Sequence, residues 1–593
     1  MPLKDQRHSS GKESRNGKVI NPSFVINSLA VRLPIKLLLL KGCNRMIEQK
    51  LQAYRDFDKI YKGFSWKIPQ YYNVAYDICD KHSSDPGKVA LYYESEDGKQ
   101  ISYTFSELKQ ASNRLANVLI GLGLRRGDRV GIFLPQRPEA ALVHLATLKI
   151  GGISVPMTPM FGPEAISHRM NDCQAKILVF AIEDNEKILD TQNQLMTIEH
   201  LIVVGGKQKG TRGFDSLLNE GSEDFKIAAT SADDPAFLVY TSGTTGLPKG
   251  ALHAHRCIPG RLTGLEMAHN FLPQEGDLFW TPADWAWIGG LLDSLIAPWA
   301  YGIPVLAAER RRFDPERAFA LIERYRVRNA FLPPLALKIM SSVTNASSRY
   351  KISMRSVHSG GESLPLDVLD WGKETFHSLC EMYGMTEMGF VVGNCPAILP
   401  IKPGSMGKAY PGHPVELVDE AGQVLPPGQL GEVAIHRSDP GMFLGYWGNR
   451  EATEAKFIGD WMLSSDLAIK DEEGYFWFRG RKDDVITSAG YRIGPEEIEK
   501  CIFRHPSVQD VAVTASPDPI RGSIVKAFII LKKEITPSEV IRDEVQVMVK
   551  KNLAAYEYPR EIEFLEDFPR TVTGKIQRHV LREREIQNKL KKL

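Results

Sequence analysis

One stretch of the chain, from Tyr240 to Gly250, combines residue types that bind phosphate. It reads Tyr-Thr-Ser-Gly-Thr-Thr-Gly-Leu-Pro-Lys-Gly, with four serine or threonine hydroxyls, three glycines and one lysine. Glycines let backbone N–H groups approach a polyphosphate, while the hydroxyls add donors and the lysine adds a positive charge. The stretch ends in Pro-Lys-Gly and therefore lacks the Walker spacing, so a kinase or P-loop ATPase is not favoured. On composition alone, it would be an ordinary polar surface loop.

Other charged motifs follow further along the chain. Gly360-Gly-Glu-Ser-Leu-Pro365, taken alone, indicates a strand-to-helix turn with a serine cap. Glu381-Met-Tyr-Gly-Met-Thr-Glu-Met-Gly389 brings two carboxylates near a tyrosine, and Trp461-Met-Leu-Ser-Ser-Asp466 ends in an aspartate. Pro569-Arg-Thr-Val-Thr-Gly-Lys-Ile-Gln-Arg578 holds a lysine beside a glycine. Each charged group alone is usually a solvated side chain. Their order on one chain favours a shared function.

In this order the motifs resemble those of the adenylate-forming superfamily, which includes acyl-CoA synthetases, firefly luciferases and the adenylation domains of peptide synthetases. The resemblance spans Tyr72 to Arg582, and the end of the chain from Gly480 looks most like medium-chain acyl-CoA synthetases. It implies ATP, Mg²⁺ and CoA as cofactors. The ATP-binding residues that it implies are Thr241, Ser242, Gly243, Thr244, Thr245, Gly246, Lys249, Gly361, Glu362, Ser363, Glu381, Met382, Tyr383, Gly384, Met385, Thr386, Asp466, Arg481 and Lys575.

The resemblance also implies individual roles. Tyr383 stacks on the adenine, Thr386 hydrogen-bonds the α-phosphate or the attacking carboxylate, and Glu387 is the metal ligand. Asp466 and Arg481 contact the ribose. The implied catalytic residues are Lys575, Thr386, Glu387 and Arg492. Lys575 bridges the carboxylate and the α-phosphate, where its charge contributes about 4 kcal/mol at ~4 Å and an effective dielectric near 20.

The run from Gly480 to Glu499 matches the hinge and CoA segment of the same family. Asp483 is the implied hinge, and Arg492 reaches the phosphates. One lysine and one pantetheine tunnel cannot serve both reaction steps in one geometry, so the resemblance implies that the C-terminal domain rotates between steps. The implied CoA-binding residues are Ala489, Gly490, Tyr491, Arg521, Lys550 and Tyr558.

Chain length of the substrate is predicted from one position. Acetate-activating relatives carry Trp-Trp ahead of x-Thr-Glu, whereas this chain has Tyr383-Gly384. Replacing an indole by hydrogen is expected to open an acyl pocket, with Gly384, His255, Trp287 and Ile288 as its lining. Since each methylene contributes about 1 to 3 kcal/mol to discrimination, a broad range of medium-chain or short branched acids is expected. An aryl-acid or short-chain ligase and a non-catalytic nucleotide-binding regulator are the alternatives.

The implied reaction has two steps. A carboxylate attacks the α-phosphate of Mg·ATP and releases pyrophosphate, and the CoA thiolate then converts the acyl-adenylate into acyl-CoA and AMP. The chain is thus identified as a member of the acyl-CoA synthetase branch, an AMP-forming carboxylic acid–CoA ligase. A peptide-synthetase module is disfavoured because no carrier-protein serine module follows Arg582.

These residues must be positioned by strands that alternate with helices. Short apolar runs occur at 128–134, 152–156, 176–180, 201–204, 236–239, 304–307, 329–332 and 356–359. A helix is expected after Tyr103, with Ser106 as its cap. Such alternation predicts stacked, mostly parallel sheets, in which ligands bind at the carboxyl ends of strands. The phosphate-binding stretch follows the run at 236–239.

The pattern of predicted elements changes towards the C-terminus. Shorter strands and turns predict a β-rich subdomain at about residues 403–480. Helices and strands after Asp484 predict a compact α+β module. We expect an N-terminal adenylation domain at 46–480, a hinge at 481–484 and a C-terminal domain at 485–593. The predicted fold class is α/β, with a large domain of stacked, mostly parallel sheets and a small mobile α+β domain.

Composition excludes several functions. The chain has 74 basic and 72 acidic residues among 593, which gives no electrostatic reason for nucleic-acid binding. Its seven cysteines form no Cys-x-x-Cys pair, which argues against a structural zinc site or a disulfide framework and favours a reducing compartment. No apolar run approaches the ~20 residues of a membrane span. The expected partners are therefore a small carboxylic acid, ATP and CoA, with the oligomeric state open.

The first 45 residues differ from the rest, with nine lysines or arginines against two acids. Three interpretations remain: an organelle transit peptide, a disordered tail, and an extension translated ahead of a start at Met46. The helical pattern that begins at Met46 favours the last interpretation and a cytoplasmic location. A transit peptide would instead direct the protein to the mitochondrial matrix.

Overall fold

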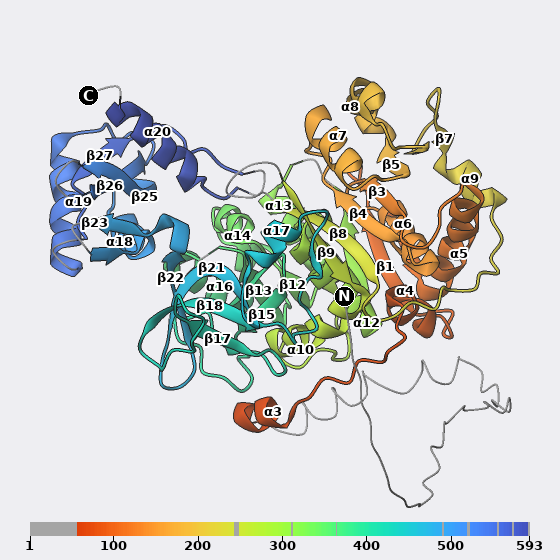
Figure 1. Cartoon of the computed structure of the whole chain (residues 1–593), viewed down its shortest axis with the longest axis horizontal. Helices are drawn as coiled ribbons and strands as arrows, with labels where there is room; N and C mark the ends of the chain where they lie inside the picture. The colour runs from red at the N-terminus through yellow and green to blue at the C-terminus, as the bar shows by residue number, and fades with distance from the viewer. Residues whose placement is uncertain are drawn as a thin grey trace, which may run out of the picture. The chain divides into compact units, whose positions relative to one another are not determined.

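The computed structural model describes residues 56–241, 248–309, 312–362, 364–488, 491–518, 522–553, 557–571 and 574–590. The proposed extension at 1–45 lies outside these ranges. Within them, two large, mostly parallel sheets form the first part of the chain (Figure 1). This confirms the predicted class of fold.

One large sheet has nine strands in the order β16-β15-β14-β13-β12-β10-β11-β1-β2. Neighbouring strands from β14 to β1 run parallel, and the pairs at both edges are antiparallel. Its strands are β1 (Val89–Glu94), β2 (Gln100–Thr104), β10 (Phe279–Trp280), β11 (Val305–Ala308), β12 (Asn329–Phe331), β13 (Ser356–Gly360), β14 (Leu379–Met385), β15 (Gly389–Gly393) and β16 (Lys408–Ala409).

The other large sheet has eight strands in the order β19-β9-β8-β4-β3-β5-β6-β7. The strands from β8 to β7 run parallel, whereas β9 is antiparallel to both β8 and β19. Its strands are β3 (Arg129–Phe133), β4 (Ile153–Met157), β5 (Ile177–Ala181), β6 (His200–Val204), β7 (Arg212–Gly213), β8 (Pro235–Thr241), β9 (Lys249–Ala254) and β19 (Gly445–Tyr446).

Helices cover both faces of these sheets. The central core joins side chains of both sheets to helices α4 (Val74–Ile78), α5 (Phe105–Gly121), α6 (Pro138–Ile150) and α10 (Pro259–Ala268). The outer face of the nine-stranded sheet packs on α13 (Pro315–Tyr325), α14 (Pro334–Met340) and α16 (Leu366–Phe376). The outer face of the eight-stranded sheet packs on α7 (Pro163–Asp172) and α8 (Asn185–Thr191). Because both faces are covered, the strands read as continuous apolar runs.

The start of α5 differs from the prediction. Thr104, rather than Ser106, caps the helix: its hydroxyl accepts from the Glu107 N–H, and the Glu107 carboxylate accepts from the Thr104 N–H at 2.7 Å. This reciprocal pair satisfies two backbone donors, which a serine inside the first turn cannot do. The helix therefore begins as soon as β2 ends.

Two smaller groups of strands follow. A five-stranded antiparallel sheet contains β17 (Val415–Val418), β18 (Leu430–His436), β20 (Phe457–Ile458), β21 (Trp461–Lys470) and β22 (Phe476–Arg481). After a short pair, β23 (Ile486–Ser488) and β24 (Tyr491–Ile493), a compact α+β group begins, drawn in blue in Figure 1. It contains α18 (Pro495–Phe503), β25 (Val508–Asp518), β26 (Gly522–Leu531), α19 (Glu539–Asn552), β27 (Glu561–Phe564) and α20 (Arg578–Leu590).

No helix among the described residues combines the length and the apolarity that a membrane crossing needs. The cysteines that the structure describes are buried and free of disulfide bonds.

Candidate active site

The phosphate-binding stretch connects two antiparallel strands. β8 and β9 pair with Thr241 opposite Lys249, and the Thr241 hydroxyl donates to the Lys249 carbonyl at 3.4 Å. Ser242, Gly243, Thr244, Thr245 and Gly246 lie outside the described residues. Since β8 is parallel to β4, the stretch leaves the sheet at the carboxyl end of β8, as predicted.

Tyr446 joins two of the predicted site residues. Its hydroxyl donates to Glu387 Oε1 at 2.5 Å, and the Lys249 ammonium lies 5.5 Å from the centre of its ring. Burial, and then the charge of Glu387, raise the pKa of Tyr446, so its hydroxyl stays protonated as a donor. Tyr446 reaches this place because β19 pairs with β9, Tyr446 opposite Ala251. Sequence reasoning missed Tyr446, since no local pattern reveals such a long-range pairing.

Glu387 could serve as a ligand of an Mg²⁺ ion that is also coordinated by phosphate oxygens. Its side chain is 5% exposed, and Tyr446 occupies one of its oxygens. Among the described residues, no group of three or more His, Cys, Asp or Glu side chains could hold a metal alone. Mg²⁺ bound to nucleotides commonly takes one or two carboxylates and completes its shell with phosphate oxygens and water. Glu387 is therefore a suitable donor for a metal brought in with ATP.

Tyr383, Asp466 and Arg481 lie together. The Tyr383 hydroxyl donates to Asp466 Oδ2 at 2.8 Å, and Arg481 Nη1 lies 3.8 Å from Asp466 Oδ1. The β21–β22 register places Asp466 directly opposite Arg481, which explains how residues fifteen apart meet. Burial raises the pKa of Asp466, while Arg481 acts in the opposite direction. This arrangement offers a carboxylate and a cation to a polar ligand such as a ribose.

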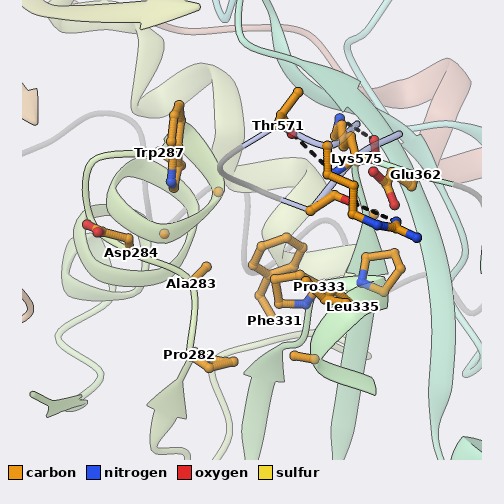
Figure 2. Close-up of a pocket in the computed structure, with 18 of the residues that line it drawn as sticks. Pro282, Ala283, Asp284, Trp287, Phe331, Pro333, Leu335, Glu362, Thr571 and Lys575 are labelled. Carbon is orange, nitrogen blue, oxygen red and sulfur yellow. Dashed lines mark hydrogen bonds between the residues drawn. The ribbon is translucent and has the colours of Figure 1, made fainter. Parts of the chain in front are cut away.

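Lys575 reaches the glycine-rich turn after β13. Its ammonium donates to the Gly361 carbonyl at 2.5 Å, beside Glu362 (Figure 2). Gly361 has φ +94° and Gly574, next to Lys575, has φ +91°, a region that favours glycine. Ser363 lies outside the described residues. Two motifs more than two hundred residues apart thus meet at one point.

A cavity of about 2760 Å³ contains these groups. Its lining includes every predicted ATP-binding residue that the structure describes, among them Thr386 and Lys249. Glu381 also lines it and accepts from the Leu364 N–H at 3.0 Å. Burial raises the pKa of Glu381, and the Leu364 N–H opposes this shift. The further lining residues from the predicted set are Thr241, Gly361, Glu362, Met382, Tyr383, Gly384, Met385, Glu387, Asp466, Arg481 and Lys575.

An apolar part of the cavity lies beside the Lys575 region. Trp287, Phe331, Pro333 and Leu335 line it, with Ile288 next to Trp287 (Figure 2). Asp284 also lines the cavity, and its Oδ2 accepts from the Thr158 hydroxyl at 2.6 Å. Burial raises the pKa of Asp284. This part can accept a hydrocarbon or aromatic group.

Of the two remaining residues predicted for the acyl pocket, His255 lies elsewhere and Gly384 lines the cavity. His255 is fully buried, accepts from the Val74 N–H at 3.2 Å and lies outside the described lining of the cavity. Gly384 does line the cavity, but an added Cβ would lie 2.1 Å from the Gly389 carbonyl oxygen. β14 and β15 approach closely where their register shifts at Tyr383 and Gly384, so a side chain larger than hydrogen at position 384 would collide with β15.

The predicted CoA and hinge residues are described only in part. Lys550 lies 4.0 Å from the centre of the Tyr558 ring, and neither residue belongs to the described lining of the cavity. Ala489, Gly490 and Arg521 lie outside the described residues, as do the side chains of Asp483, Tyr491 and Arg492. The backbone places Tyr491 and Arg492 on β24.

Comparisons with known proteins agree with this geometry. Residues 80–447 match the family model "AMP-binding enzyme", and residues 497–575 match "AMP-binding enzyme C-terminal domain". Acetyl-coenzyme A synthetase of Bacillus subtilis is 38% identical, over 90% of this chain and 95% of that protein. Human mitochondrial acyl-coenzyme A synthetase ACSM2A is 36% identical, over 88% and 92%.

A solved structure supports the same assignment. The anthranilate CoA ligase AuaEII in complex with anthranoyl-AMP superposes with a TM-score of 0.80 at 29% identity, covering 88% of this chain and 99% of that chain. The family models, the sequence relatives and the fold therefore converge: the chain belongs to the AMP-binding enzyme family, in its acyl-CoA synthetase branch.

Proposed function

We propose that the chain activates a medium-chain or short branched carboxylic acid with ATP and transfers the acyl group to CoA. In the first step a carboxylate oxygen bonds to the α-phosphorus, and the bond to pyrophosphate breaks. In the second step the CoA thiolate bonds to the acyl carbon, and AMP leaves with the electron pair of the acyl–oxygen bond. The protein's residues bind, orient and neutralise charge in both steps.

The observation that carries this proposal is the position of Lys575. Its ammonium donates to the Gly361 carbonyl, and Lys575 lines the same cavity as the Tyr383–Asp466–Arg481 group and the apolar residues. An α-phosphate and a carboxylate joined there would both be near this positive charge. The pentavalent transition state carries more negative charge than its reactants, so the same contact stabilises it more than the ground state.

Other residues take supporting roles in the proposal. Lys249 and Tyr446 face the β- and γ-phosphates that leave, and Thr386 orients the reacting oxygens. Mg²⁺, when bound with ATP through Glu387, supplies charge neutralisation. Asp466 and Arg481 hold the ribose. Lys550 and Tyr558, on the C-terminal domain, meet the nucleotide part of CoA.

The apolar lining supports an acyl group longer than acetate. Trp287, Ile288, Phe331 and Pro333 present hydrocarbon and aromatic surface without a bulky group at position 384. The similarity to an acetyl-coenzyme A synthetase and to an anthranilate CoA ligase makes acetate and aryl acids the competing substrates.

Pyrophosphate exchange over a panel of acids tests the proposal. The panel runs from acetate through octanoate and includes branched and aromatic acids, with and without CoA. We expect exchange without CoA, acyl-CoA and AMP only with CoA, and the highest kcat/KM for a medium-chain or branched acid. A maximum at acetate or at an aryl acid would replace the proposed substrate class, and no exchange with any acid would refute the activity.

A further inference from the structure

A chain of polar contacts holds the turn that carries Lys575. Arg570 Nη1 donates to the Gly574 carbonyl at 3.0 Å, directly before Lys575. Arg570 Nη2 donates to Asp510 Oδ2 at 2.6 Å. Asp510 lies in β25, in the body of the C-terminal sheet, and its Oδ1 accepts from the Val511 N–H at 3.0 Å. The Arg570 guanidinium therefore connects the turn to a strand of the sheet.

The same carboxylate also meets the first part of the chain. Lys338, in α14, places its ammonium 3.6 Å from Asp510 Oδ2 and 5.7 Å from the centre of the Phe503 ring. Beside this contact, an added Cβ on Gly574 would lie 2.5 Å from Leu335 Cδ2, so the turn and α14 are in close contact. Asp510 Oδ2 thus contacts one cation from its own domain, Arg570, and one from α14, Lys338.

These contacts are sheltered enough to have an energetic effect. The side chain of Asp510 is 16% exposed, that of Arg570 is 32% and that of Lys338 is 40%. A hydrogen bond between charged groups is stronger than a neutral one, whereas a largely exposed ion pair contributes little. We therefore expect Arg570 to matter more than Lys338.

We propose that Asp510 and Arg570 are positioning residues that place Lys575 for adenylate formation, and that Lys338 docks on Asp510 in that step. The inference rests on the proposed function, because it assigns Lys575 to the first step. Neither Asp510 nor Arg570 needs to touch the substrate. They fix where the Lys575 backbone lies, and so how far its ammonium reaches towards Gly361.

The contacts of Asp510 should affect only one of the two half-reactions. Lys575 serves the first step, and rotation of the C-terminal domain would separate Asp510 from Lys338 before the second. Loss of either contact should therefore slow adenylate formation and leave thioester formation from supplied acyl-adenylate unchanged. A role in stability alone would weaken both half-reactions together.

The experiment compares two assays on the full chain. Asp510→Asn keeps the shape of the side chain and removes its charge. We expect about a tenfold lower kcat for acid-dependent pyrophosphate exchange, as follows from loss of one partly exposed, charge-assisted hydrogen bond. Conversion of supplied acyl-adenylate and CoA should change less than about twofold by the same reasoning. Lys338→Met, on the other side of the contact, should show the same selectivity with a smaller loss.

Asp567→Asn is the matched control. Asp567 also lies near Arg570, at 3.9 Å from Nε, but its side chain is 82% exposed. We expect exchange within about twofold of the unchanged protein, since exposed pairs contribute little. Asp510→Glu, which keeps the charge, should recover part of the exchange.

The outcomes separate the inference from the proposed function. Absence of exchange in the unchanged protein, with every acid, would refute the proposed function itself. Normal exchange in Asp510→Asn would overturn the inference alone, and so would an equal loss in both half-reactions. A selective loss of exchange, with Asp567→Asn unaffected, would support it.

Discussion

Tyr446→Phe removes one hydroxyl from the nucleotide site and keeps the ring. The hydroxyl donates to Glu387 Oε1 at 2.5 Å, and Glu387 is 5% exposed, so water cannot easily replace the lost donor. A hydrogen bond to a charged group contributes ~2 kcal/mol, which corresponds to roughly a 30-fold change in a rate or affinity. We expect kcat/KM for ATP to fall by about this factor.

The ring makes a second, smaller contribution. The Lys249 ammonium lies 5.5 Å from its centre, near the outer limit for a cation–π contact. Tyr446→Phe keeps this contact and Tyr446→Leu removes it. The additional loss in Tyr446→Leu should be about 0.5 kcal/mol, or roughly twofold.

The assay is pyrophosphate exchange with ATP varied at saturating acid, followed by the reverse titration. We expect the loss in the ATP titration, with KM for the acid unchanged. Tyr475→Phe is the control, because Tyr475 also donates one hydrogen bond through its hydroxyl, to the Pro400 carbonyl at 2.8 Å, and lies outside the described lining of the cavity. Full kcat/KM for ATP in Tyr446→Phe, or an equal loss in Tyr475→Phe, would refute this reasoning.

Three further predictions follow from named contacts. Lys575→Ala should abolish pyrophosphate exchange yet still convert supplied acyl-adenylate to acyl-CoA, and an unchanged exchange rate would contradict its role. Gly384→Ala should lower the free energy of unfolding, measured by denaturant titration, by ~2 kcal/mol or more, because its Cβ would lie 2.1 Å from the Gly389 oxygen. Gly121→Ala is the control, since its Cβ meets nothing within 4 Å, and its free energy of unfolding should equal or exceed that of the unchanged protein. Burial raises the pKa of Asp466, so its carboxylate is protonated at a higher pH than that of an ordinary aspartate. KM for ATP should therefore rise as the pH falls through this raised pKa, a trend that Asp466→Asn should flatten.

The strands could be predicted because both faces of the large sheets are covered. In β8, Phe237 packs in the central core and Leu238 in the outer core behind α7. Successive side chains therefore all need to be apolar, and each strand stands out as a continuous run. The residue that caps α5 was harder to predict, because Thr104 and Ser106 both precede a helical pattern and only the geometry distinguishes them.

The site could be predicted where motifs are contiguous in the sequence. Asp466 and Arg481 were both expected to contact the ribose, and the β21–β22 register places them opposite each other. His255 was predicted to line the acyl pocket. Six residues of extended strand, however, place it about 20 Å from Lys249 along β9.

Long-range pairing limited the rest of the prediction. Tyr446 enters the site through β19, a strand of two residues whose partner lies almost two hundred positions earlier. The contact between Asp510 and Lys338 joins segments of similar separation. Neither contact arises from local periodicity, so the sequence pattern does not indicate them before the fold is known.

The β21–β22 ladder has a consequence for the order of events during turnover. Leu467 still pairs with Gly480, and Asp466 with Arg481, immediately before the segment Lys482–Asp484. A rotation of the C-terminal domain would have to be absorbed after this last rung. The two groups proposed to hold the ribose would then remain on the stationary side of the pivot. The nucleotide would then stay bound to the large domain while Lys575 moves away and the CoA thiol approaches. The adenylate would therefore not be released between the two steps.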